Sequence, residues 1–119
     1  MIRIQRLFKS FKYALKGLIK TFKEEQNLQI QSTIGALVLL AAWYFGVSRT
    51  EWIVLVFIIG VVVLMELANS AVERITDVLK PRINGYVKEI KDIMAAAVML
   101  ASIISVIIGL IIFWPYIFG

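Results

Sequence analysis

Three long apolar segments limit what this chain of 119 residues can fold into. They cover residues 28–47, 52–79 and 93–118, and a helix of about 20 apolar residues crosses a membrane. Hydrophobic residues make up 61% of the chain, whereas soluble domains contain about 45–50% apolar residues. We therefore expect an all-α membrane protein with a single domain over residues 1–119.

The N-terminal segment, residues 1–24, is predicted to be an amphipathic surface helix. Its first 23 residues carry seven Lys or Arg residues and no acidic residue. Hydrophobic residues recur at spacings of three and four, which is the pattern of one helix face. These residues are Ile4, Leu7, Phe8, Phe11, Leu15, Leu18, Ile19 and Phe22. Because such helices lie in the membrane interface, we expect an anionic membrane surface as the partner, and no nucleic acid.

The distribution of basic residues predicts the orientation in the membrane. The linker over residues 46–51 contains one basic residue, Arg49, whereas the connection over residues 74–91 contains five. Basic loops stay on the cytoplasmic side. The N-terminus and residues 74–92 are therefore expected in the cytoplasm, and the C-terminus outside.

A polar stripe begins at Glu66, inside the second apolar segment. On a helix, Glu66, Asn69, Glu73 and Asp77 fall within about 80° of arc, along about 16 Å. An ionisable residue at membrane depth costs about 2.5–3.5 kcal/mol or more, so it is a functional candidate by default. The stripe could simply hold packed helices together through hydrogen bonds. We favour a divalent cation site, because three acids on one face repel one another without a cation.

A second acidic pair, Glu24-Glu25, precedes the first membrane segment. It is either a solvated helix-capping turn or part of a metal site at the height of Glu73. Magnesium commonly takes one or two protein carboxylates together with phosphate oxygens and water. One glutamate from each segment would suffice, and spacing leaves open whether Glu24 or Glu25 is used.

A third polar cluster precedes the last membrane segment. It contains Arg82, Asn84, Lys88, Lys91 and Asp92. The lysines either extend to the lipid headgroups or contact nucleotide phosphates. The chain has no G-x-x-x-x-G-K-[ST] loop, which excludes a Walker-type nucleotide site. It also has no cysteine or histidine, which excludes thiolate chemistry and a histidine general base.

The run Glu66-Leu-Ala-Asn69-Ser70-Ala-Val-Glu73, followed by Asp77, resembles the signature of the prokaryotic diacylglycerol kinase and undecaprenol kinase family. The resemblance covers nearly the whole chain and includes Lys16-Gly17-Leu18, Glu24-Glu25 and Lys91-Asp92. It implies a homotrimer with one surface helix and three transmembrane helices per chain. It also implies a lipid kinase of the prokaryotic plasma membrane, with a cytoplasmic active site, that transfers the γ-phosphate of MgATP to a lipid hydroxyl.

The resemblance further implies roles for individual residues. Glu66 would be the general base for the lipid hydroxyl, with Asn69 in support, and Glu25 and Glu73 would bind Mg²⁺. The ATP site would comprise Arg6, Tyr13, Glu25, Glu73, Asp77, Arg82, Ile83, Asn84, Lys91 and Asp92. The lipid site would comprise Arg6, Ser10, Phe11, Ala14, Leu15, Glu66, Ala95 and Trp114. This division suits phosphoryl transfer, which depends on positioning, charge neutralisation and a base.

The lipid is expected to be undecaprenol or diacylglycerol. The run Glu24-Glu25-Gln26-Asn27 is similar to the undecaprenol-preferring branch, whereas the aromatic C-terminus with Trp114 is similar to the diacylglycerol branch. We favour undecaprenol, whose phosphorylation would feed the recycling of undecaprenyl phosphate. Phosphorylation of diacylglycerol would feed phospholipid metabolism instead.

Two other functions are compatible with a small apolar chain. In a proton-coupled multidrug transporter, an intramembrane glutamate exchanges a proton for a cationic substrate. Such a transporter needs four spans and has no use for Asp77, Arg82 and Lys91 in the cytoplasm. A non-enzymatic trimeric scaffold would use the small residues of the last segment to pack helices, and it would transfer no phosphate.

Overall fold

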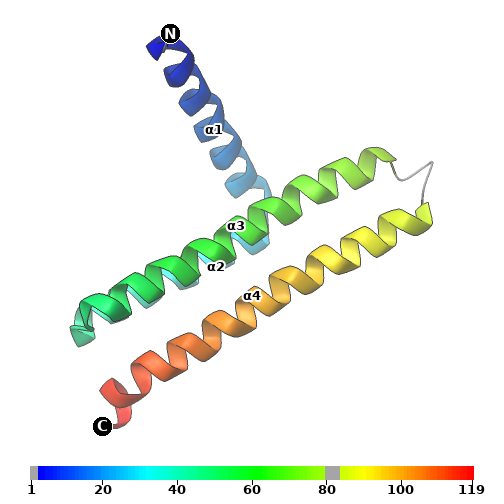
Figure 1. Ribbon diagram of the computed structural model, residues 1–119. Helices are drawn as coiled ribbons and strands as arrows, with labels where there is room; N and C mark the ends of the chain where they lie inside the picture. The colour runs from blue at the N-terminus through cyan, green and yellow to red at the C-terminus, as the bar shows by residue number, and fades with distance from the viewer. Residues whose placement is uncertain (1–2, 80–83) are drawn as a thin grey trace.

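The computed structural model describes residues 3–79 and 84–119, and these two ranges contain helices and no strand. In chain order the helices are α1 (Ile4–Glu24), α2 (Gln26–Phe45), α3 (Arg49–Leu79) and α4 (Asn84–Phe118). α2, α3 and α4 form a bundle, and α1 projects from the start of α2, beside the middle part of α3, while α3 and α4 extend further (Figure 1). The prediction of an all-α fold is confirmed.

Three helices, α2, α3 and α4, are long and apolar enough to cross a membrane. α3 has 31 residues and α4 has 35, which corresponds to about 46 and 52 Å at 1.5 Å per residue. Because the hydrocarbon core is about 30 Å thick, both helices extend beyond it into water. The described part of the chain thus holds three candidate membrane helices, where the transporter alternative needs four.

The helices begin earlier than the apolar segments do. The sequence predicts the last membrane helix over residues 93–118, but α4 begins at Asn84. Likewise α3 begins at Arg49 rather than at residue 52. Apolar composition marks only the part of a helix that lies in hydrocarbon, whereas hydrogen bonding along the backbone continues the helix into water. The extra turns of α4 carry the polar groups of the candidate site.

A tight turn joins α2 to α3. Gly46 has a positive φ of 63°, which L side chains rarely adopt, so α2 ends at Phe45 rather than at the predicted residue 47. The backbone N–H of Ser48 donates to Glu51 Oε1 at 2.9 Å. In return, the backbone N–H of Glu51 donates to Ser48 Oγ at 3.2 Å. This reciprocal capping pair starts α3 and reverses the chain direction.

The end of the bundle with this turn and the C-terminus, called the turn end below, contains an apolar core. Its buried members are Ala42, Val47, Leu55 and Ile112. The ring of Phe45 packs against the rings of Phe113 and Tyr116, with centroids 6.0 Å apart in each case. Aromatic and aliphatic packing therefore holds α2, α3 and α4 together at this end.

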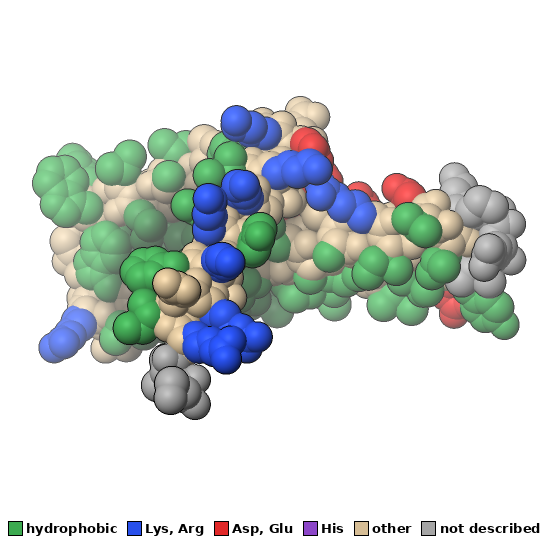
Figure 2. Space-filling model, turned by 90° about the horizontal axis from the view of Figure 1, so that it is seen from above, with side chains coloured by type: hydrophobic (Ala, Val, Ile, Leu, Met, Phe, Trp, Pro, Cys, Tyr) green, Lys and Arg blue, Asp and Glu red, His purple; other side chains and the backbone are tan. Residues whose placement is uncertain are grey.

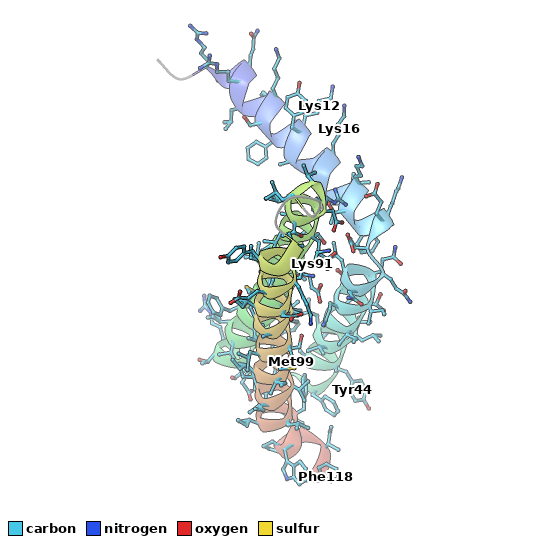
Figure 3. All side chains as sticks on the ribbon, turned by 90° about the vertical axis from the view of Figure 1, so that its right-hand side faces the viewer. Lys12, Lys16, Tyr44, Lys91, Met99 and Phe118 are labelled. Atoms are coloured by element: carbon cyan, nitrogen blue, oxygen red, sulfur yellow. The ribbon has the colours of Figure 1, made fainter. Side chains whose placement is uncertain are left out.

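The opposite end, called the α1 end below, contains the α1–α2 junction, the last turns of α3 and the first turns of α4. α1 is exposed along its length and contacts chiefly α2. Figure 3 shows Lys12 and Lys16 on the side of α1 that faces away from the bundle. A helix with one apolar face and one basic face can lie on a membrane surface.

Candidate active site

Glu66 lies on the buried face of α3. It continues a row of buried residues spaced three or four apart, and only 5% of its surface is exposed. The other members of the row are Leu55, Ile58, Val62 and Ser70. Its side chain is therefore enclosed by the chain's own helices rather than by lipid. A carboxyl group in such a place is costly and is a candidate for function.

The polar stripe of α3 continues from Glu66 toward the α1 end. Asn69 Nδ2 donates to Glu73 Oε1 at 3.3 Å, which orients the Glu73 carboxylate. One turn further, Asp77 accepts a hydrogen bond from Lys91 Nζ of α4 at 2.6 Å. The residues that helical spacing placed on one face thus have polar neighbours along that face.

Glu25 occupies the break between α1 and α2. Its backbone is extended, with φ −107° and ψ 108°. Gln29 stabilises the break, because its Nε2 donates to the Phe22 carbonyl at 2.8 Å, near the end of α1 where carbonyls lack helical partners. Glu25 Oε1 lies 3.9 Å from Nη2 of Arg74, which directly follows Glu73 on α3. The break therefore brings a carboxylate from the junction toward the stripe of α3.

Arg74 of α3 is a residue of this site that the sequence analysis did not single out. Its Nη2 lies 2.8 Å from Glu24 Oε2 and 3.9 Å from Glu25 Oε1. The ion pair ties the junction to α3, and Glu24 is the more closely engaged of the two glutamates. A signal was present in the sequence, since Arg74 directly follows Glu73.

In the described part of the chain, the carboxylates of the stripe do not gather into a cluster of three. Within residues 3–79 and 84–119, no three acidic side chains come close enough to hold a metal ion. Carboxylates four residues apart on a helix are separated by about 6 Å along its axis. A site made of Glu25 and Glu73 still suits Mg²⁺, which commonly keeps water and phosphate oxygens as ligands.

The expected nucleotide residues of α4 lie at the α1 end. Lys91 lies on α4 (Figure 3), where it pairs with Asp77 of α3, and the exposed Asp92 follows it. Arg82 and Ile83 lie outside the described residues, as does the side chain of Asn84. Figure 2 shows basic side chains gathered over α1, with acidic side chains beside them. A surface that joins basic groups to carboxylates can bind both phosphates and a cation.

A single chain does not bring the predicted residues of α1 to Glu66. These residues are Arg6, Ser10, Phe11, Tyr13, Ala14 and Leu15, all of them exposed. α1 projects from the bundle away from the buried face of α3 (Figure 1). Of the predicted lipid residues on α4, Ala95 is exposed, and Trp114 lies at the turn end.

The similarity to known proteins extends over most of the chain. The family model for prokaryotic diacylglycerol kinase matches residues 12–113. This range includes the α1–α2 junction, the stripe of α3 and the start of α4. Among the expected site residues, Arg6, Ser10, Phe11 and Trp114 lie outside it.

Individual relatives match at nearly full length. The undecaprenol kinase of Bacillus subtilis (strain 168) is 35% identical over 94% of this chain and 91% of that protein. The diacylglycerol kinase of Haemophilus influenzae is 28% identical over 93% of this chain and 95% of that protein. The diacylglycerol kinase of Escherichia coli (strain K12) is 26% identical over 93% and 91%. The chain therefore belongs to the prokaryotic diacylglycerol kinase family of membrane lipid kinases.

Proposed function

We propose that this protein is an ATP- and Mg²⁺-dependent kinase that phosphorylates the hydroxyl group of undecaprenol. Family membership makes it a lipid kinase that uses ATP. The observation that carries the rest is the buried Glu66, which shares a face of α3 with Glu73, while Arg74 ties the junction with Glu25 to the same helix. A base beside a pair of carboxylates that can bind Mg²⁺ is what phosphoryl transfer to an alcohol requires.

Glu66 is the general base of this proposal. In the reaction, a bond forms between the lipid oxygen and the γ-phosphorus, and the bond from that phosphorus to the bridging oxygen of ADP breaks. The proton of the lipid hydroxyl passes to the Glu66 carboxylate. Asn69 supports the site indirectly through its hydrogen bond to Glu73.

Glu25 and Glu73 are the proposed ligands of Mg²⁺. The preference of Arg74 for Glu24, at 2.8 Å against 3.9 Å for Glu25, favours Glu25 as the ligand. Glu73 is held by Asn69 through one oxygen, so its other oxygen is oriented as well. When bound, the ion would neutralise phosphate charge.

The nucleotide is proposed to bind at the α1 end, beyond Glu73. Lys91, paired with Asp77 at 2.6 Å, places a positive charge near the phosphates. Asp92 directly follows it in the sequence. The remaining proposed contacts are Arg6, Tyr13, Arg82, Ile83 and Asn84.

Undecaprenol is favoured over diacylglycerol by the relatives as well as by the run from Glu24 to Asn27. The undecaprenol kinase of Bacillus subtilis, 35% identical to this chain, is matched over 91% of its length, whereas the diacylglycerol kinase of Synechocystis sp., 33% identical, is matched over 59% of its length. The proposed lipid contacts on α1 are Arg6, Ser10, Phe11, Ala14 and Leu15, with Ala95 and Trp114 on α4.

A homotrimer with active sites shared between chains is also proposed. It is supported by the position of α1, which carries predicted site residues away from its own Glu66 (Figure 1). In the proposed orientation, the α1 end faces the cytoplasm of a prokaryotic cell, where ATP is present, and the basic face of α1 lies near anionic headgroups.

A transfer assay tests the proposal. Purified protein in lipid receives ATP labelled at the γ-phosphate, with undecaprenol or diacylglycerol offered in parallel and with Mg²⁺ omitted as a control. We expect label in undecaprenol phosphate at a higher rate than in phosphatidic acid, and none without Mg²⁺. Faster transfer to diacylglycerol would overturn the substrate assignment, and transfer at an equal rate without divalent metal would overturn the metal requirement.

A further inference from the structure

Ser102 of α4 lies opposite Glu66 of α3. The two helices are paired at the α1 end by the contact between Lys91 and Asp77. Glu66 lies eleven residues before Asp77, and Ser102 lies eleven residues after Lys91. Eleven residues make about three full helical turns, so in antiparallel helices these two residues lie at about the same level.

Gln31 of α2 reaches the same level from the third helix. Its Nε2 donates to Ser102 Oγ at 3.2 Å, and its side chain lies near enough to the Glu66 carboxyl group to interact with it as well. An amide nitrogen carries two N–H donors, so one can serve the serine while the other serves the carboxylate. Three polar side chains, one from each membrane helix, therefore meet at Glu66.

Close packing keeps α2 within reach. At Gly35, one turn from Gln31, an added Cβ would lie 2.8 Å from Ile59 Cγ2 of α3. Gln31 and Gly35 both line a small, partly open cavity of about 60 Å³ between the helices. The absence of a side chain at position 35 thus lets α2 approach α3 closely enough for the Gln31 amide to reach Glu66.

We propose that Gln31 is a positioning residue, anchored on Ser102, that orients the Glu66 carboxylate toward the lipid hydroxyl. The inference rests on the proposed role of Glu66 as the general base. Without the donor from α2, the carboxylate rotates about its side-chain bonds and its oxygen leaves the line to the hydroxyl. A displacement of about 1 Å at a reacting group can reduce the rate by about 100-fold. Nucleotide binding at the α1 end does not involve this amide.

Gln31→Met tests the inference, because methionine keeps the length of the side chain and removes the donor. In the transfer assay with MgATP and undecaprenol, we expect kcat to fall by about 10- to 100-fold with unchanged KM for both substrates. The matched control is Thr33→Val on the same helix, an exposed position, where kcat should stay at the parent value. A parent kcat for Gln31→Met would overturn the inference.

Ser102→Ala provides a second test, which distinguishes a positioning role of Gln31 from a role in helix packing alone. We expect a fall in kcat of about 3- to 10-fold, and no further fall when it is added to Gln31→Met, because Ser102 acts only through Gln31. Ser105→Ala removes a hydroxyl that donates within α4, to the Ser102 carbonyl at 2.7 Å, and serves as the control. Additive effects of Gln31→Met and Ser102→Ala would contradict the inference.

The two proposals fail in different ways. If Glu66→Gln keeps the parent rate, Glu66 is not the base and the proposed function fails. If Glu66→Gln is inactive while Gln31→Met and Ser102→Ala are fully active, only the positioning role fails. If Gln31→Met does not fold, the milder Ser102→Ala decides, since a parent kcat there overturns the role and a several-fold fall with unchanged KM supports it.

Discussion

The two ends of the helix bundle are built from different interactions. At the α1 end, ion pairs and hydrogen bonds join the helices, as in the contacts of Arg74 with Glu24 and of Lys91 with Asp77. At the turn end, a buried apolar cluster around Leu55 and a group of aromatic rings join them. Half-exposed ion pairs contribute about 0–1 kcal/mol each, whereas buried apolar side chains contribute more. We infer that the turn end supplies stability and that the α1 end is free to be shaped by chemistry.

The largest expected effect is at the boundary between the two ends. Glu66→Gln keeps the shape of the side chain and removes the base, so we expect kcat to fall by about 1000-fold. MgATP binding and the unfolding midpoint should remain at the parent values. Phosphate transfer is measured with labelled ATP, and Glu89→Gln, at an exposed position of α4, is the control. A fully active Glu66→Gln protein would remove the chemical role from the α1 end.

The next effect concerns the carboxylate pair. Glu73→Gln should reduce kcat/KM for MgATP by about 100-fold, because a neutral amide is a poor ligand for Mg²⁺. A titration with Mg²⁺ should then show partial recovery at higher concentration. Glu24→Gln is the matched control, because Glu24 already pairs with Arg74 at 2.8 Å. Equal decreases in kcat/KM for MgATP in Glu24→Gln and Glu25→Gln would contradict the assignment of Glu25 as the ligand.

At the turn end, the expected effect is on stability. Leu55 is 1% exposed, and Leu55→Ala should lower the free energy of unfolding by about 2 kcal/mol through lost packing. The turnover of the remaining folded protein should stay at the parent value. Unfolding in mixed micelles measures the change, with Leu40→Ala, at an exposed position of α2, as the control. A large fall in turnover with unchanged stability would show that the two ends are not separate in function.

The smallest expected effect is at the outermost contact of the turn end. Tyr116 Oη donates to Glu51 Oε1 at 2.6 Å. Tyr116→Phe removes this bond and keeps the ring, so we expect a decrease in unfolding midpoint smaller than that of Leu55→Ala, without a change in kcat. Tyr44→Phe, an exposed ring at the same end, is the control. A loss of turnover in Tyr116→Phe would connect the turn end to catalysis.

The sequence predicts much of this architecture because its signals are local. Helical periodicity and apolar composition identify the helices, and the spacing from Glu66 to Asp77 places an acidic stripe on one face. Apolar composition did not predict the start of α4, because the helix begins at Asn84, before the residues become apolar. Spacing along α3 also does not reveal the partners of the stripe on other helices, such as Lys91 of α4, which pairs with Asp77.

What the sequence by itself determined is therefore the set of helices, their membrane character and the acidic face of α3. The tertiary structure decided which residues meet across that face. The contact of Gln31 with Ser102 joins residues 71 positions apart, and that of Arg74 with Glu24 joins residues 50 positions apart. Such contacts depend on the register and rotation of packed helices. Packing over their whole length sets both quantities, so the spacing within any one helix does not reveal them.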